Sequence, residues 1–285
     1  MSHLGREAAD RPHGWVAGDP GAPPFRVVAT DLDGTLLRRD LTISPRTQAV
    51  LGRIRAAGVL HLVVTGRSAV GCRRLLGGVT YDGVAVCGQG AELYDFATAR
   101  VLASRLHDTE VLVSALRRLR EVTGPLEFGV VSGKPDGQFL ATPGFAAKPG
   151  RDWTVVTNER KLWERPVAKV LLRHPDLDDD TLTALAEREC APQVAVTHSG
   201  TALVEVLPAG VSKASGLAAA ADHIGFTQAE TIAFGDMPND IPLLTWAGWG
   251  VAMGNAHPRL RTYADEITVD HEQDGVAVVL ERLFL

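Results

Sequence analysis

Apolar runs that end in a turn and lead into a helical pattern recur in the first third of the chain. The runs are Arg26–Thr30, Val59–Thr65 and Val84–Cys87. Between the first two, Ser44 is a predicted helix N-cap, with Pro45 at the first helical position. Apolar strands that alternate with helices are typical of a parallel sheet covered on both faces. The sequence therefore predicts an α/β fold whose core is a doubly wound, Rossmann-like parallel sheet.

The middle of the chain has a different pattern, in which hairpin strands are mixed with helices. The expected elements there are Thr109–Val122, Phe128–Ser132, Gln138–Ala141, Val167–Arg173, Leu177–Cys190, Val194–His198 and Ala202–Leu207. After Pro208 the strand–helix alternation returns. We therefore expect four segments: a disordered tail at 1–24, the first part of the core domain at 25–106, an inserted α+β cap domain at 107–208, and the second part of the core at 209–285.

The composition narrows the class of protein. The 285 residues carry a formal net charge of −5, so no overall basic field favours nucleic acid or an anionic membrane as a partner. No apolar run is long enough to span a bilayer, and the first 24 residues lack the apolar core of a signal peptide. The cysteines, Cys72, Cys87 and Cys190, form no zinc or redox motif. We expect a cytoplasmic protein, as a monomer or a homodimer.

Two acids directly follow the first apolar run, in the sequence Asp31-Leu32-Asp33-Gly34. Because side chains alternate along a strand, Asp31 and Asp33 share one side, at the strand end where α/β sheets bind ligands. Neighbouring carboxylates in such a crevice need a cation, or one of them holds a proton. Both needs suit a magnesium-dependent phosphoryl-transfer site. The alternative is a turn rich in Asp with no ligand.

Three further polar segments lie at strand ends or helix starts. They are Thr65-Gly66-Arg67, Lys213, and the run Gly235-Asp236-Met237-Pro238-Asn239-Asp240. In a doubly wound sheet such strand ends lie along one edge. Each segment also has a simpler interpretation: Thr65 as a helix cap, Lys213 as a solvated helix residue, and Asp236 and Asp240 as acids of a surface loop.

In this order the segments resemble the motifs of the haloacid dehalogenase-like (HAD) superfamily. More narrowly, the chain is similar to the Cof-type phosphatases, which carry a C2-type α+β cap between the second and third motifs. The resemblance covers nearly everything from Phe25 to Leu285 and includes the C-terminal segments Gly250–Ala256 and Asp274–Ala277. The chain departs from the family pattern at Gln89, where Asn is common, and at Ala214, where Gly is usual.

The resemblance implies a role for each acid. Asp31 would be the nucleophile that forms an aspartyl-phosphate, and Asp33 would be the general acid and base. Asp31, Asp236 and the backbone carbonyl of Asp33 would bind Mg²⁺, which prefers oxygen ligands. Asp240 would not bind the metal directly but would steady the water molecules bound to it.

The resemblance also implies how the phosphoryl group is held. Thr65, Lys213 and backbone N–H groups near Leu32–Gly34 and at Gly66 would bind its oxygens. Asn239 would steady Lys213 or the phosphate. Arg67, beside Thr65, is a candidate for contact with the substrate. Lys134 and His198, in cap loops, are further candidates for contact with the leaving group, but a solvated surface position is the expected one for both.

The predicted function is that of a Mg²⁺-dependent phosphatase acting on a small phosphorylated metabolite. A sugar phosphate is the expected substrate, and a nucleotide or pyridoxal phosphate is the alternative. Asp33 favours phosphate esters, because relatives that dehalogenate or act as P-type ATPases lack an acid at that position. Two alternatives stay open from the sequence: a phosphomutase acting on hexose phosphates, and a sensor that binds a phosphorylated ligand without catalysis.

Overall fold

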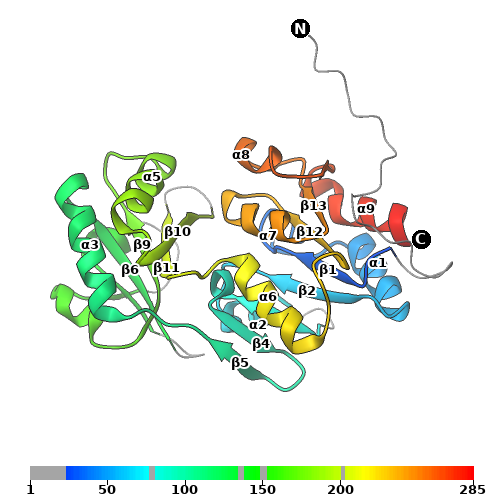
Figure 1. Ribbon diagram of the computed structural model, residues 1–285, viewed down its shortest axis with the longest axis horizontal. Helices are drawn as coiled ribbons and strands as arrows, with labels where there is room; N and C mark the ends of the chain where they lie inside the picture. Colours follow the sequence, from blue (N-terminus) through cyan, green and yellow to red (C-terminus); the bar gives the residue numbers. More distant parts are fainter. Residues whose placement is uncertain (1–23, 77–80, 134–137, 148–152, 200–202) are drawn as a thin grey trace, which may run out of the picture.

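The computed structural model describes residues 24–76, 81–133, 138–147, 153–199 and 203–285. Nearly all of the expected tail 1–24, and Lys134, lie outside the described residues. These described residues form two sheets of unequal size, which lie side by side along the long axis of the molecule (Figure 1).

The larger sheet has eight strands, and its first six run parallel. Their spatial order is β14 (Glu266–Ile267), β13 (Trp249–Ala252), β12 (Thr231–Gly235), β1 (Val27–Thr30), β2 (Leu60–Val64) and β3 (Val84–Cys87). An antiparallel hairpin extends the sheet beyond β3 with β4 (Glu92–Asp95) and β5 (Arg100–Ser104). The predicted doubly wound parallel core is confirmed, and the hairpin at its edge is an addition that the sequence pattern did not predict.

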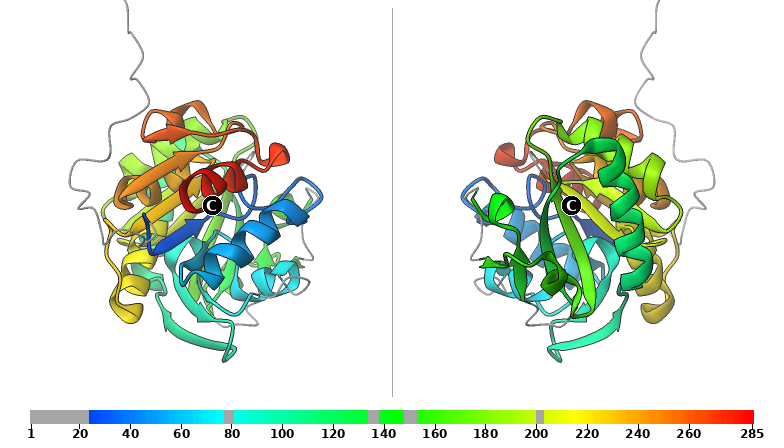
Figure 2. Two further views of the ribbon diagram at one scale, coloured as in Figure 1. Left: turned by 90° about the vertical axis from the view of Figure 1, so that its right-hand side faces the viewer. Right: turned by 90° about the vertical axis from the view of Figure 1, so that its left-hand side faces the viewer.

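Helices cover both faces of this sheet. On one face lie α1 (Pro45–Ala56), α2 (Ala69–Leu76) and α9 (Gly275–Phe284), and on the other lie α6 (Lys213–Ile224), α7 (Ile241–Trp246) and α8 (Pro258–Arg261). Side chains alternate between the two faces along β1, so both faces are apolar. Val28 belongs to the hydrophobic cluster formed with α1, α2 and α9, whereas Val27 and Ala29 belong to the cluster formed with α6, α7 and α8. Figure 2 shows α1 and α6 on opposite sides of the sheet.

Helix starts follow the expected capping chemistry. The Ser44 side chain accepts a hydrogen bond from the Thr47 backbone N–H at 3.0 Å, with Pro45 at the first helical position, as predicted. At the start of α6, Ser212 and Ser215 cap each other reciprocally. This cap places Lys213, the first residue of α6, at a fixed point beside the sheet.

The smaller sheet has six strands. Their order is β10 (Val194–His198), β11 (Val204–Pro208), β9 (Val167–Arg173), β6 (Glu127–Ser132), β7 (Phe139–Ala141) and β8 (Thr154–Val155). Helices α3 (Thr109–Thr123) and α5 (Asp179–Cys190) pack on its outer face (Figure 1), and the short α4 (Pro143–Ala146) lies on the opposite face. The described residues also form short 3-10 turns at Gly88–Gly90, Glu159–Trp163, Pro238–Asp240 and His271–Gln273.

The chain passes between the two sheets twice, before α3 and after β11. His107, in the first connection, donates from its backbone N–H to the Val167 carbonyl at 2.8 Å, and its ring Nε2 lies 3.2 Å from the Val206 carbonyl. Burial lowers the pKa of His107 to about 4, so the ring is neutral near pH 7 and Nε2–H donates to that carbonyl. The first connection is thus fastened to two strands of the smaller sheet.

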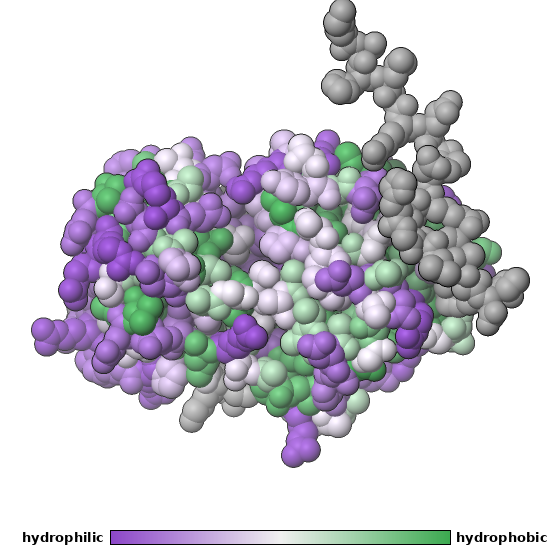
Figure 3. All heavy atoms as spheres, in the orientation of Figure 1, coloured by the Kyte–Doolittle hydropathy of each residue, from purple (hydrophilic) through white to green (hydrophobic). Residues whose placement is uncertain are grey.

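The surface is unevenly divided between polar and apolar residues. Figure 3 shows hydrophilic residues gathered over the α3 and α5 side, and hydrophobic residues at the lower edge near β4 and β5. Leu102 on β5 and Leu106 just after it are among the exposed large hydrophobic residues. Within the described ranges, none of the helices has the length and apolar character needed to cross a membrane.

Candidate active site

The candidate site lies where the strand order of the larger sheet reverses. From β1 the chain moves to β2 on one side, and β12 later pairs with the other side of β1. Thr30 and Phe234 are partners in the β1–β12 register, so Asp31 and Asp236 leave neighbouring strands at the same edge. Ligands of open α/β sheets bind in the crevice at such a point.

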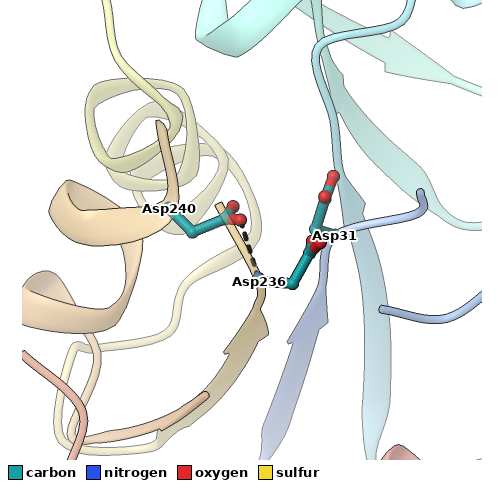
Figure 4. A group of neighbouring side chains, drawn as sticks. All are labelled: Asp31, Asp236 and Asp240. Carbon is teal, nitrogen blue, oxygen red and sulfur yellow. Dashed lines mark hydrogen bonds between the residues drawn. The ribbon is translucent and has the colours of Figure 1, made fainter. Parts of the chain in front are cut away.

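Three carboxylates meet at this crevice. Asp31 and Asp236 are each 6% exposed and Asp240 is fully buried, and one oxygen of each lies within 4.8 Å of the others (Figure 4). The turn after β12 orients Asp240, whose Oδ2 accepts hydrogen bonds from the backbone N–H groups of Asp236 at 3.0 Å and Met237 at 3.1 Å. Thr35 donates to Asp236 Oδ1 at 3.0 Å.

The electrostatics of the group show that it is crowded with negative charge. Burial raises the pKa of Asp31 to about 7, against the opposing effect of Lys213. Burial, followed by the charges of Asp31 and Asp240, raises the pKa of Asp236 to about 8. A cation among these oxygens would relieve the repulsion. Hard carboxylate oxygens at this spacing suit a divalent ion such as Mg²⁺, so the residues present fit the predicted metal.

Lys213 is the positive charge nearest to these acids. Its Nζ lies 2.8 Å from Asp31 Oδ1 and 2.5 Å from Asp240 Oδ1, and its side chain is fully buried. Burial alone would lower the pKa of Lys213, but the two carboxylates outweigh burial and raise it. The simpler interpretation of Lys213 as a solvated helix residue is therefore wrong.

Asp33 lies at the rim of the crevice. Its carboxylate accepts two hydrogen bonds from the Arg67 guanidinium, at 2.6 Å from Nε and 2.5 Å from the terminal nitrogen. The Asp33 side chain is 45% exposed. The structure thus brings Arg67 to Asp33, in the fork geometry that arginine and carboxylate favour. The predicted metal contact of Asp33 concerned its backbone carbonyl, and this pairing of its side chain leaves that prediction untested.

Other predicted residues line the same crevice. Thr65 is buried, and its hydroxyl accepts a hydrogen bond from the Arg67 backbone N–H at 3.1 Å. Asn239 is also buried, but its side-chain amide donates to Gln89 Oε1 at 3.1 Å. The Leu32 side chain belongs to the core of the larger sheet, and its carbonyl accepts from Leu37 N at 2.8 Å. Only the backbone of Leu32 is therefore available to a ligand.

A cavity of about 600 Å³ extends from Asp31, Asp33 and Thr65 to the inner face of the smaller sheet. Two charged residues of that sheet, Lys169 on β9 and Glu205 on β11, pair at 2.7 Å where the sheets meet. Lys169 Nζ also donates to the Gly66 carbonyl at 3.0 Å, which connects the two sheets directly.

Glu205 has further partners, since Ser199 and Gln89 both donate to its carboxylate. Burial alone would raise the pKa of Glu205, but Lys169 and these hydrogen bonds lower it. Sequence reasoning missed Glu205, although it is a lone charge within the apolar run Ala202–Leu207, and charged residues are seldom buried unless paired.

His198 lies away from this cavity. It is buried rather than solvated, and its Nε2 is 3.1 Å from Asp180 Oδ1. It lines a second cavity of about 270 Å³, which Lys213 and Asn239 also line.

The fold and the site together define an α/β protein whose doubly wound sheet carries a crowded carboxylate centre at its switch point. Residues 28–280 match the family model of haloacid dehalogenase-like hydrolases. The chain therefore belongs to the haloacid dehalogenase-like hydrolase family.

Similar proteins agree with this assignment. The chain is 30% identical to the pyridoxal phosphate phosphatase YbhA of Escherichia coli, over 88% of this chain and 96% of that one. It is 26% identical to the 5-amino-6-(5-phospho-D-ribitylamino)uracil phosphatase YcsE of Bacillus subtilis, over 92% and 96%. A solved haloacid dehalogenase-like hydrolase from B. subtilis, 22% identical, covers 91% of this chain and 100% of its own, with a TM-score of 0.77. The predictions of this family, of its fold and of a phosphatase are confirmed.

Proposed function

We propose that the protein is a Mg²⁺-dependent phosphatase that hydrolyses a small phosphorylated metabolite through an aspartyl-phosphate intermediate. The observation that carries this proposal is the placement of Asp31. It lies at the switch point of the sheet, beside Asp236, with Lys213 2.8 Å from its Oδ1. A carboxylate nucleophile, neighbouring acids for a metal and a buried lysine for phosphate are the parts that phosphoryl transfer requires.

Asp31 attacks phosphorus through a carboxylate oxygen, and the bond from phosphorus to the leaving oxygen breaks. Lys213 fixes the orientation of Asp31 through Oδ1. Asp31, Asp236 and the backbone carbonyl of Asp33 would hold the metal, and Asp240 supports the group through its contact with Lys213. A bound Mg²⁺ supplies the positive charge that lets an anionic carboxylate approach an anionic phosphate.

The phosphoryl oxygens are held by fixed donors in the crevice. We assign this role to Lys213, the Thr65 hydroxyl and the backbone N–H groups of Leu32, Gly34 and Gly66. These groups are held in place before the substrate arrives, because Lys213 and Thr65 are both buried and already hydrogen-bonded. Preorganised donors of this kind supply much of the stabilisation of a phosphoryl-transfer transition state.

Asp33 is the proposed general acid and base. It gives a proton to the leaving oxygen, and it later accepts a proton from the water that hydrolyses the aspartyl-phosphate. Its exposed position at the rim suits a group that exchanges protons with solvent, and Arg67 holds its carboxylate in place. Arg67 is also close enough to the crevice to contact the substrate, since it lines the same cavity.

We propose that residues 107–208 form a cap domain over a core domain made of 25–106 and 209–285. Separate hydrophobic clusters for the two sheets support this division. The contact between Lys169 and Gly66 brings the cap against the loop at Thr65–Arg67. The cap thereby limits the access of solvent to Asp31, which is 6% exposed, while Asp33 at the rim stays in reach of water.

Phosphate release from a panel of phosphorylated metabolites, with and without EDTA, tests the proposal. We expect release that requires Mg²⁺ and falls to background in Asp31→Asn. Asp222→Asn, an exposed acid on α6, is the matched control and should keep full activity. Conversion of a hexose 1-phosphate to its 6-phosphate without release of phosphate would instead identify a phosphomutase, and Mg²⁺-dependent binding without any turnover would identify a sensor.

A further inference from the structure

Gln89 lies at the point where three segments of the candidate site meet, and it is 1% exposed. Its side-chain Nε2 donates to Glu205 Oε1 on β11 at 3.1 Å, and its Oε1 accepts from Asn239 Nδ2 at 3.1 Å. Its backbone N–H donates to the Thr65 carbonyl at 2.9 Å. One residue therefore joins the smaller sheet to the turn after β12 and to the end of β2.

The backbone conformation at Gln89 points to a role for its side chain. Gln89 has φ 62° and ψ 23°, in the left-handed region that L-residues seldom adopt. Its neighbours Gly88 and Gly90 also have positive φ, but glycine adopts such angles without strain. Strained residues that keep a side chain cluster at functional sites, so the contacts of the Gln89 amide are the feature to explain.

The charge of Glu205 dictates which way the Gln89 amide faces. Burial opposes the ionisation of Glu205, but Lys169 outweighs burial and lowers its pKa, so near pH 7 its carboxylate only accepts hydrogen bonds. The NH₂ group of Gln89 must therefore face Glu205, which leaves its carbonyl oxygen for Asn239. The Asn239 amide must in turn present an N–H to Gln89. A charge on the smaller sheet thus sets the orientation of Asn239.

The groups that Gln89 contacts in the larger sheet border the crevice from two sides. Asn239 lines the large cavity, and it directly precedes Asp240, whose carboxylate contacts Lys213. The Gln89 amide also packs against Gly66, where an added Cβ would lie 2.5 Å from its Nε2. A turn of the Gln89 side chain would therefore disturb both of these sides at once.

We propose that Gln89 is a positioning residue that holds Asn239 and Gly66 in their phosphate-binding arrangement only while Glu205 of the smaller sheet is in contact with it. The inference rests on the proposed function, because it takes this crevice as the place of the phosphate. If the smaller sheet moves away, Glu205 moves with it and the Gln89 amide is free to turn. The phosphate site is thus complete only when the two sheets enclose the substrate.

Gln89→Glu tests the direction of these hydrogen bonds, because a carboxylic acid that holds its proton has the shape of the glutamine amide. In that form its O–H donates to Glu205 and its carbonyl accepts from Asn239, whereas the ionised form places two carboxylates face to face. We expect kcat/KM for p-nitrophenyl phosphate to be at least about tenfold below that of the unaltered enzyme at about pH 8.5, and within about threefold of it at about pH 5.5. Each comparison is made at one pH, so the titration of groups that both enzymes share cancels.

Three further variants separate positioning from damage to the fold. Glu205→Gln, added to Gln89→Glu, returns one donor and one carboxylate to the pair and should restore kcat/KM at about pH 8.5 to within about threefold of the unaltered enzyme. Gln89→Met keeps the length of the side chain without its hydrogen bonds and should lose about tenfold at both pH values. Gln193→Glu is the matched control, because Gln193 is exposed and accepts from Arg118 at 3.2 Å. It should leave kcat/KM unchanged.

A kcat/KM of Gln89→Met within about threefold of the unaltered enzyme would overturn the inference, and so would a loss in Gln89→Glu that persisted at acidic pH and in the double variant. In either case phosphate release by the unaltered enzyme would leave the proposed function intact. The Kd of inorganic phosphate with Mg²⁺, measured by calorimetry, gives the same comparisons without turnover. If the variants changed this Kd as expected while no phosphate ester was hydrolysed, the role of Gln89 would stand and the proposed phosphatase reaction would be wrong.

Discussion

The close approach of Gly34 to Asp236 makes Gly34→Ala a direct test of the candidate site. A Cβ at position 34 would lie 2.3 Å from Asp236 Oδ2, and such contacts below 3.0 Å are essentially never seen. The carboxylate must therefore move away from the place where it meets Asp31. A shift of about 1 Å in a reacting group costs about 10²-fold in rate. We expect kcat/KM for phosphate release to fall by about 10²-fold.

The same substitution also strains the backbone, because Gly34 has φ +74°. A left-handed conformation costs an L-residue about 1–2 kcal/mol, which should appear as a lower free energy of unfolding in urea. Gly58→Ala separates the two effects. Gly58 has φ +82° and nothing within 4 Å of its added Cβ, so this control should lose similar stability and keep its kcat/KM. If the two variants had kcat/KM values within about threefold of each other, the argument from the Gly34–Asp236 contact would be refuted.

Three further predictions concern charge. Lys213→Met leaves buried carboxylates without a counter-charge and should lower the free energy of unfolding in urea by about 3–5 kcal/mol at high pH. The loss should shrink at acidic pH, where the carboxylates are protonated. An equal loss at high and at acidic pH would contradict the role of Lys213 as their counter-charge. In EDTA, the raised pKa values of Asp31, about 7, and Asp236, about 8, mean that the folded state holds protons which the unfolded chain has released. The Tm measured by calorimetry should therefore fall as pH rises from about 6.5 to about 8.5, and Mg²⁺ should weaken the dependence; a flat profile in EDTA would count against the crowded acids. Finally, Lys169→Met and Glu205→Leu should each destabilise the protein, while the double variant should cost clearly less than their sum; additive losses in the urea cycle would show that the pair is not coupled.

Most strands and helices could be predicted because their causes are local. Val84–Cys87 and Val167–Arg173 have the predicted bounds, and Ser44 caps its helix as expected. The hairpin of β4 and β5 was missed because β5 is largely exposed and lacks an apolar alternation. A strand at the edge of a sheet depends on its partner more than on its own sequence.

The candidate site divides in the same way. Asp31 and Asp236 could be predicted from the sequence because each is a polar residue at the end of an apolar strand. The pairing of β1 with β12 then brings the two together. The pairing of Glu205 with Lys169, 36 residues away, and with Gln89, 116 residues away, has no local signature. A lone charge in an apolar strand shows that a partner must exist, but only the folded chain shows which one.

The neighbouring position of β1 and β12 has a consequence for synthesis of the protein. Thr35 and Asp236, which hydrogen-bond in the finished site, are 201 residues apart. At about 5–20 residues per second, a ribosome needs roughly 10–40 s to make the intervening chain. During that interval one edge of β1, a strand buried along its whole length in the final fold, has no partner. The nascent chain thus carries a half-built sheet with an open edge while the inserted segment emerges, and this is the stage at which a chaperone would be most useful.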